Sequence, residues 1–355
     1  MITIATSEIK EFLKRARPVK TYSILPILAY YRLDCVGDSA TFTKTNNNAW
    51  VIHEIAADFE SNISLLIDER LLQAMVSNSS SDTITITQDD VNITLSDGKS
   101  NVAFPVQSLV NYPAFPERDQ TQGVTPLPAE MLYAIGAATS IIDQKLINQY
   151  CNCFINPVGH ITDVFSTHNG HIMYRKWFNV TLPAMTISPE VGSIISGFES
   201  AQYYTANNYD FYECGKTTYG FIQSTYKCPN YSRPFASISN KDYFEVDRLQ
   251  LIQFAELTVS SSVNTYQIIT LEDNAMLGIT FKHDDKEYQL HTKMEFEAEK
   301  TFSPQPFHVS GKLLITLLKA IDTKTVRWSP VNETTYCLWS TEDPDLLTLL
   351  LGTVI

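Results

Sequence analysis

The sequence predicts an α+β fold of three similar domains, each with two helices packed on antiparallel sheets. Two observations predict it. Six helix-like segments recur at near-equal intervals, and the stretches between them alternate apolar and polar residues at period two. A unit of one short helix and three or four strands has one apolar helix face and one apolar sheet face, so it needs a neighbouring unit to close a core. Six such units pairing two by two give three domains.

The helix-like segments each start with a capping or helix-starting residue and continue with apolar residues at helical spacing. Asp and Ser are good N-caps, and Pro suits the first helical turn. The segments begin at Thr6, Asp68, Pro128, Ser188, Asp247 and Ser310, at intervals of 62, 60, 60, 59 and 63 residues. Intervals this regular along the whole chain indicate an internal repeat.

Short alternating stretches separated by turn residues predict antiparallel strands. They occupy residues 82–95, 100–106, 160–167, 201–215, 265–281 and 286–298. Two polar stretches, 116–126 and 237–243, have the composition of exposed joins between domains. The predicted domains are therefore residues 1–121, 122–238 and 239–355.

The composition is that of a globular protein, with 44% hydrophobic and 18% charged residues. No apolar run approaches the length of a membrane span, and the N-terminal segment lacks an apolar signal core. We therefore expect a cytoplasmic protein whose six cysteines are reduced. The net charge of -13 argues against indiscriminate binding to nucleic acid, which depends on Lys and Arg. It leaves room for a basic strip on one surface, because net charge does not say where the charges lie.

The common catalytic motifs are missing from the sequence: it contains no G-x-x-x-x-G-K-[ST], G-x-G-x-x-G, G-x-S-x-G or H-E-x-x-H. Cys151 and Cys153, with His160, His168 and His171 nearby, are the one group that could hold zinc in a metal-dependent hydrolase. Alternation at period two instead places both thiols on one face of a strand. We expect no enzyme, no metal and no cofactor.

Several segments resemble one known family in order and spacing. Residues 21–46 contain a Leu-Pro-Ile-Leu run followed by a strand, a Gly turn and a second strand, and residues 98–117 end in a Tyr-Pro-x-x-Pro run. The segment VFSTHNGHIMYRK resembles an Ala-Thr-Asp-Gly-His-Arg-Leu signature, with Thr167, Gly170 and His171 retained. The segment KCPNYSRPF resembles Phe-Pro-Asp-Tyr-Arg-Arg, with Pro229, Tyr231 and Arg233 in place. These features are similar to the beta subunit of bacterial DNA polymerase III, the beta sliding clamp family.

The chain also departs from the family pattern. The signature turn has one extra residue, Ile172 stands where the family has Arg, and Met173 stands where it has Leu. The C-terminal Met-Pro-Met-Arg-Leu of the family is replaced by residues 351–355, Leu-Gly-Thr-Val-Ile. The resemblance is thus to a divergent member of the DNA-clamp fold.

The resemblance implies a DNA sliding clamp, a non-catalytic processivity factor that encircles duplex DNA and tethers the replicative polymerase and other replication and repair proteins. Polymerase and clamp loader would bind through short peptides in an apolar cleft. The alternative is a monomeric clamp-fold adaptor that keeps the cleft without forming a ring. The cleft residues carried over from the family are Tyr150, Thr167, Gly170, His171, Ile172, Met173, Pro229, Arg233, Pro234, Leu349, Leu350, Leu351 and Gly352. The apolar tail 346–355 could equally be a last buried strand, and both readings are compatible.

The resemblance also implies that helices face the DNA. On the first helix Lys10, Lys14 and Arg17 fall on one face, opposite Ile9 and Phe12. Spaced cations of this kind suit contacts to phosphate that do not read sequence. The predicted DNA-binding residues are Lys10, Lys14, Arg17, Lys20, Arg70, Lys145, Arg248, Lys312 and Lys319. Against this, the third and fourth helices carry neither Lys nor Arg.

Three domains cover only part of a ring, so the resemblance implies a head-to-tail homodimer. An exposed apolar strand edge needs such a partner to avoid aggregation. The edges predicted to pair are the strand Val102–Phe104 and the region around Leu257 and Val259.

Overall fold

The computed structural model describes residues 1–20, 25–116, 123–142, 150–236, 238, 242–260, 266–272, 275–282, 287–295, 307–332 and 334–352. The chain divides into two compact units. The first contains Met1–Ala129 and Phe198–Gln223, and the second contains Glu130–Gly197 and Ser224–Ile355.

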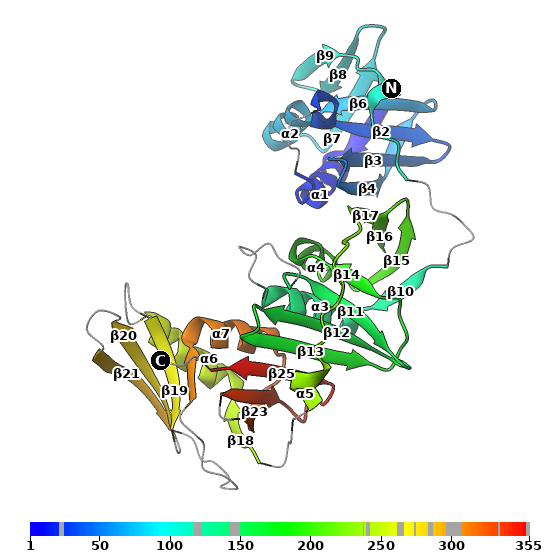
Figure 1. The fold of residues 1–355 in the computed structure, drawn as a ribbon. Helices are drawn as coiled ribbons and strands as arrows, with labels where there is room; N and C mark the ends of the chain where they lie inside the picture. The colour runs from blue at the N-terminus through cyan, green and yellow to red at the C-terminus, as the bar shows by residue number, and fades with distance from the viewer. Residues whose placement is uncertain are drawn as a thin grey trace. The chain divides into compact units, whose positions relative to one another are not determined.

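Within the described residues, the chain runs six times through a strand, a helix and three strands (Figure 1). The first two repeats are β1 (Ile2–Ala5), α1 (Thr6–Ala16), β2 (Tyr30–Val36), β3 (Ser39–Thr45) and β4 (Ala49–Ile55), then β6 (Ile63–Asp68), α2 (Glu69–Asn78), β7 (Thr83–Gln88), β8 (Asn92–Ser96) and β9 (Asn101–Pro105). The middle two are β10 (Thr125–Pro128), α3 (Ala129–Ser140), β11 (Cys153–Val158), β12 (Ile161–His168) and β13 (Ile172–Phe178), then β14 (Met185–Ile187), α4 (Pro189–Ile195), β15 (Ser200–Ala206), β16 (Tyr209–Cys214) and β17 (Thr217–Ile222). The last two are β18 (Phe244–Asp247), α6 (Arg248–Ser260), β19 (Tyr266–Glu272), β20 (Ala275–Lys282) and β21 (Glu287–Glu295), then β22 (Phe307–Ser310), α7 (Gly311–Ala320), β23 (Thr325–Asn332), β24 (Thr335–Trp339) and β25 (Leu346–Leu351).

Four described elements stand outside this repeat. They are β5 (Ala57–Phe59), α5 (Ser232–Ala236) and two 3₁₀ turns, η1 (Pro26–Ala29) and η2 (Leu109–Asn111).

The predicted helices are confirmed, and their caps explain where they begin. The Asp68 carboxylate accepts hydrogen bonds from the backbone N–H groups of Arg70 and Leu71, and the Ser188 hydroxyl accepts one from Val191. Helix α5 was not predicted, because five residues with a proline among them carry no helical periodicity.

The repeats pair by exchanging their first strands. The sheet β10-β15-β16-β17, for example, joins the first strand of the third repeat to the three strands of the fourth. Each predicted domain therefore contains two repeats and two such half-sheets, which is the α+β plan that the sequence predicts. All the strand pairs are antiparallel.

Half-sheets of consecutive predicted domains continue into one another within each unit. In the first unit β17 pairs with β4, which makes the eight-stranded sheet β10-β15-β16-β17-β4-β3-β2-β6. In the second unit β13 pairs with β25, which makes the eight-stranded sheet β14-β11-β12-β13-β25-β24-β23-β18. The five-stranded sheet β5-β1-β7-β8-β9 and the four-stranded sheet β21-β20-β19-β22 end without such a continuation.

The sheet of the second unit is covered on both faces, and alternation along β12 shows how. The Ser166 hydroxyl donates to the carbonyl oxygen of Ala138 in α3 at 2.6 Å, so even-numbered residues of β12 face α3. Phe165 instead stacks on Tyr231 beside α5, with ring centroids 4.2 Å apart. We call this second side of the sheet the α5 face.

Two further observations bear on the expectations from composition. No helix in the described ranges is long and apolar enough to cross a membrane. All six cysteines are free thiols.

Candidate functional site

The turn between β12 and β13 is built from the residues that the sequence singled out. The Thr167 hydroxyl donates to the carbonyl oxygen of Ile172 at 2.7 Å and accepts the backbone N–H of Gly170 at 3.1 Å. Asn169 and Gly170 both have positive φ, at 48° and 82°. Asn and Gly adopt left-handed backbone more readily than other residues do. The extra residue of this turn is therefore accommodated without forcing a β-branched residue into positive φ.

The C-terminal strand β25 lies beside this turn and resolves the two readings of the apolar tail. Leu349 pairs with Met173, and Leu350 pairs with Ile172. Leu350 and Ile172 are fully buried on the side of the sheet that faces α3. Met173, Leu349 and Leu351 lie on the α5 face. The strand therefore serves the core with one side and the candidate cleft with the other.

Gly352, just after β25, has no room for a side chain. A Cβ there would lie 2.8 Å from a ring carbon of Phe307, and the Gly352 N–H donates to the carbonyl oxygen of Thr334 at 2.7 Å. The residue therefore acts through its backbone position.

The α5 face carries an apolar cluster that joins the signature strands to α5. Its buried members are Phe154, Phe165, Tyr231, Phe235, Cys337 and Leu349, with Met173, Cys228, Ile238, Val331, Trp339 and Leu347 packed partly buried against them. Two cleft residues carried over from the family, Met173 and Leu349, thus share one cluster with Tyr231 and Phe235. We call residues 226–236, which contain helix α5, the α5 segment.

A depression of about 250 Å³ opens beside this cluster. It is lined by Asn156, Val158, Asp163, Arg175, Pro229, Asn230, Tyr231, Ser232, Phe235 and Ala236. Asp163 is only 1% exposed, and its carboxylate accepts from Arg175 Nε at 2.9 Å and from the Tyr231 hydroxyl at 2.6 Å. Burial raises the pKa of Tyr231, so the phenol stays a donor.

Sequence reasoning did not single out Asp163 or Arg175. The sequence does contain a hint: Asp163 is a charged residue in the apolar strand ITDVFST, at a position where alternation points the side chain inward. Arg175 in the next strand is a candidate partner for its charge. Only the register, in which Phe165 faces Arg175, brings the two charges together.

The other carried-over residues sit at the rim. Tyr150 is 40% exposed, and His171 and Arg233 are exposed, whereas Pro229 and Pro234 lie half-buried on either side of Tyr231. The structure therefore brings together Thr167, Gly170, Met173, Leu349 and the α5 segment.

No protein-family model matches the chain, and no curated protein matches its sequence. Solved structures match over its whole length. The DNA polymerase III subunit beta of Pseudomonas aeruginosa has a TM-score of 0.85 at 14% identity, with 100% of each chain covered. The chain has the fold of a DNA sliding clamp.

Two other structures agree with that assignment. The DNA polymerase III beta chain of Streptococcus pneumoniae has a TM-score of 0.83 at 16% identity, covering 100% of this chain and 99% of that one. The Caulobacter crescentus beta sliding clamp has a TM-score of 0.84 at 13% identity, covering 100% and 98%. The three-domain α+β clamp fold is thereby established, and low identity marks a divergent sequence.

In this clamp fold, helix α1 has the two faces that the sequence predicts. Ile9 and Phe12 are buried, whereas Lys10, Lys14 and Arg17 are exposed. Lys20, just past the helix, is exposed as well. Arg15 points elsewhere: it pairs with Glu11 at 3.0 Å and lies over the Phe198 ring. Three spaced cations therefore remain on one surface of α1.

The cations of the other helices differ in their exposure and in their pairing. The Arg70 side chain is 89% exposed, and Lys312 is exposed. Lys319 pairs with Glu256 at 2.8 Å. Arg248 Nε donates to the carbonyl oxygen of Thr323 at 2.6 Å, and its Nη1 donates to Leu318 at 3.2 Å, so this guanidinium caps the end of α7. Lys145 lies outside the described residues.

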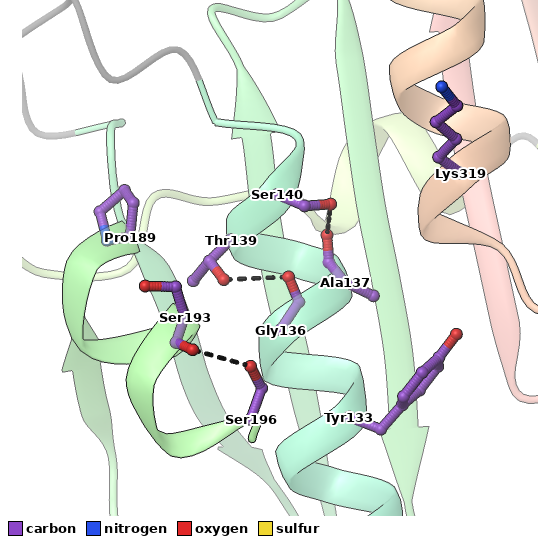
Figure 2. A pocket seen from close by; sticks show the side chains of 9 residues that line it. All are labelled: Tyr133, Gly136, Ala137, Thr139, Ser140, Pro189, Ser193, Ser196 and Lys319. Carbon is purple, nitrogen blue, oxygen red and sulfur yellow. Dashed lines mark hydrogen bonds between the residues drawn. The ribbon is translucent and has the colours of Figure 1, made fainter. Parts of the chain in front are cut away.

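Helices α3 and α4 cross closely and leave a second depression, of about 390 Å³ (Figure 2). A Cβ on Gly136 would lie 2.6 Å from Ser196 Cβ, and one on Gly192 would lie 2.3 Å from Thr139 Cγ2. The serine and threonine hydroxyls around the depression donate to carbonyls close by in their own helical segments, as Ser140 does to Ala137 at 2.7 Å. The residues that line it are Tyr133, Gly136, Ala137, Thr139, Ser140, Pro189, Ser193, Ser196 and Lys319.

The residues of the predicted dimer interface lie on two kinds of element. Val102 and Phe104 lie on β9, the end strand of its sheet, with Phe104 turned into the core. Leu257 and Val259 lie on helix α6, so they are not on a strand edge. Leu257 is nevertheless 60% exposed. Residues 248–260 form a helix because their apolar residues recur at helical spacing, although the β-branched Thr258 and Val259 near its end favour a strand.

The Cys/His group does not converge. Cys153 is buried, which raises the pKa of its thiol, and His168 Nδ1 lies 2.7 Å from the carbonyl oxygen of Ile141. In the part of the chain that the structure describes, no three His, Cys, Asp or Glu side chains are grouped to hold a metal ion.

Proposed function

We propose that this protein is a DNA sliding clamp, a non-catalytic processivity factor that encircles duplex DNA and tethers a replicative polymerase. The observation that carries the proposal is the likeness of the whole chain to sliding clamps, with both chains covered almost completely. A clamp needs three similar domains and no catalytic constellation, and the sixfold repeat supplies the former.

The internal repeat supports closure into a two-chain ring. Twice along the chain, the last strand of one half-sheet pairs with the last strand of another: β17 with β4, and β25 with β13. By the same rule β9 and β21 are the remaining equivalents, and each is the end strand of its sheet. We infer that β9 of one copy pairs with β21 of a second copy, which closes a head-to-tail dimer and covers both of these strand edges. This replaces the region around Leu257 and Val259 as the expected partner of β9.

The cleft on the α5 face supports the tethering of partners. Preformed apolar pockets with a few polar anchors are typical sites for short peptides, and Met suits adaptable surfaces. We propose that polymerase and clamp-loader peptides bind over Met173, Leu349 and Leu351, with His171 and Arg233 at the rim. A Pseudomonas aeruginosa sliding clamp has been solved bound to griselimycin. We propose that this compound binds the cleft on the α5 face of the present chain, which makes it a probe of that cleft.

The DNA-facing surface is proposed on the helices. The exposed cations Lys10, Lys14, Arg17 and Lys20 supply phosphate contacts without base contacts, as sliding requires. Arg70 and Lys312 would add to them, and Lys319 would do so on leaving Glu256. Arg248 keeps its place in the proposal only as a secondary contact, because it already caps α7. We place the protein in the cytoplasm, with duplex DNA, polymerase and clamp loader as partners and no membrane, metal or cofactor.

A second candidate is a monomeric clamp-fold adaptor. The observation that favours it is the lack of Lys and Arg on α3 and α4, whose crossing presents hydroxyls instead. Such a protein would keep the cleft and lose topological binding to DNA.

Light scattering at several concentrations separates the two. A mass near twice 40.1 kDa supports the ring, whereas a strict monomer at high concentration contradicts it. Retention on nicked circular DNA, with loss on linearisation, then tests encirclement. The linearised plasmid is the matched control, because it presents the same phosphates without a closed path.

A further inference from the structure

The segment that carries α5 is held on the sheet by a buried polar contact that lies outside the carried-over cleft residues. The Tyr231 hydroxyl donates to Asp163 Oδ2 at 2.6 Å, and Asn156 Nδ2 donates to the same hydroxyl at 2.9 Å. Arg175 supplies the compensating charge through Nε, at 2.9 Å from Oδ2, and Nη2, at 3.3 Å from Oδ1. We call Asp163, Arg175 and Tyr231 the latch.

The latch is rigid because its charges are buried and its rings are stacked. A carboxylate that is 1% exposed needs hydrogen-bond donors, and losing one leaves it under-satisfied. The Tyr231 ring stacks on Phe165 at an interplanar angle of 13° and meets Phe235 edge-on. The Arg175 guanidinium lies 5.8 Å from the Tyr231 centroid and 5.6 Å from that of Phe235. One arginine therefore contacts the rings of both Tyr231 and Phe235.

The latch controls the position of one wall of the cleft. Pro229 lies two residues before Tyr231, and Arg233 and Pro234 lie between Tyr231 and Phe235. These three residues belong to the proposed peptide site. The opposite wall, Met173 and Leu349, packs in the same apolar cluster as Tyr231 and Phe235. The α5 segment cannot move without changing the distance between the two walls.

We infer that Asp163 and Tyr231 are positioning residues of the partner cleft: their hydrogen bond holds α5 against the sheet, so that the wall formed by Pro229, Arg233 and Pro234 stands ready for a peptide. This inference rests on the proposed function, and it names residues that touch the wall and not the peptide.

Cys228 provides a local reporter for the latch. Its thiol is half-buried against the apolar cluster, three residues before Tyr231. Burial, with the nearby Asp163 charge, raises its pKa to about 12, so it reacts slowly with maleimides while the segment is docked. Cys151 is the other half-buried cysteine, and the remaining four are buried. A Cys151→Ser background therefore leaves Cys228 as the first thiol to respond.

The test measures N-ethylmaleimide labelling of Cys228 and griselimycin binding by calorimetry in the full chain. Tyr231→Phe removes only the hydroxyl. We expect it to raise the labelling rate of Cys228 and to weaken griselimycin binding, each on the order of tenfold, the factor set by one hydrogen bond to a charged group. Asp163→Asn is expected to act in the same direction. Tyr226→Phe is the matched control, because Tyr226 is an exposed tyrosine of the same segment, and it should change neither quantity.

The outcomes separate local opening from unfolding and from failure of the proposed function. Mass spectrometry must find Cys228 labelled and the four buried cysteines unlabelled, with the solution mass unchanged. Wild-type labelling in Tyr231→Phe would overturn the latch, and faster labelling with unchanged griselimycin affinity would overturn its role in the cleft. If the wild-type chain failed to bind griselimycin, the proposed cleft would fail, and with it the positioning role, even where labelling showed that the hydrogen bond holds α5.

Discussion

The hydroxyl of Thr167 donates to the carbonyl oxygen of Ile172 at 2.7 Å, across the turn that carries Asn169 and Gly170. The Thr167 hydroxyl oxygen also accepts the Gly170 N–H, so one side chain satisfies two backbone groups of the turn. The retained Thr and Gly of the signature are thus explained by backbone geometry, before any role in binding is considered.

Replacing this hydroxyl should loosen the turn. We expect Thr167→Val, which keeps the shape, to lower the free energy of unfolding by about 1–2 kcal/mol, because buried backbone groups lose their partner. Urea denaturation measures the change. Thr167→Ser keeps the hydroxyl and should stay close to wild type, and equal losses in both variants would show that the methyl group matters instead.

The α1 cations should govern the electrostatic part of DNA binding. We expect Lys14→Gln to lower the slope of log K against log salt by about 0.9, the value for one lost phosphate contact. Fluorescence anisotropy with a short duplex over a salt series measures the slope. Lys99→Gln is the control, because Lys99 lies in the turn between β8 and β9, where it bonds Ser80. An unchanged slope in the variants of Lys10, Lys14 and Arg17 would remove α1 from the DNA surface.

The crossing of α3 and α4 should tolerate no added methyl group. A Cβ on Gly192 would lie 2.3 Å from Thr139 Cγ2, so Gly192→Ala must push the helices apart, and we expect a loss of about 1–3 kcal/mol of stability. Gly197→Ala is the control, since its Cβ would find its nearest neighbour at 3.5 Å. Thermal unfolding followed by circular dichroism compares the two variants. Equal stability would mean that the crossing is loose.

Protonation of Asp210 should stabilise the folded state of the first unit at acid pH. Burial raises the pKa of Asp210 despite hydrogen bonds from Tyr203 at 2.8 Å and Gln223 at 3.0 Å. The folded state therefore holds this proton more tightly than the unfolded chain. The stabilisation that this bound proton gives the folded state is complete below the unfolded carboxyl pKa of about 3.9. It is lost as pH rises through the folded pKa.

We accordingly expect Asp210→Asn to be more stable than wild type at neutral pH, with the advantage disappearing toward pH 4. Urea midpoints across this pH range measure it. Asp89→Asn should behave in the opposite sense, because backbone N–H groups of Asn92 and Val91 lower the pKa of that carboxyl. A pH-independent difference between Asp210→Asn and wild type would contradict the assignment.

Much of the fold could be predicted because its signals are local. Caps such as Asp68 and Ser188, the helical spacing after them and the alternation along 161–168 depend on neighbours in sequence. Helix α5 was missed because it is stabilised by Tyr231 and Phe235 packing on distant strands. Arg248 was assigned to the DNA surface because it opens the fifth helix, whereas the carbonyl groups that it binds lie 70 and 75 residues away in the chain.

The sequence by itself determined the six repeats, their helix starts and the pairing of repeats into three domains, since each repeat has an apolar face that only a neighbour can cover. The tertiary structure decided which side of each strand is used. It buried Leu350 and Ile172, turned Leu349 and Met173 toward α5, and brought Asp163 to Arg175 and Tyr231. These choices depend on strand register, which couples residues far apart in the chain, and a shift of one residue would exchange the two faces.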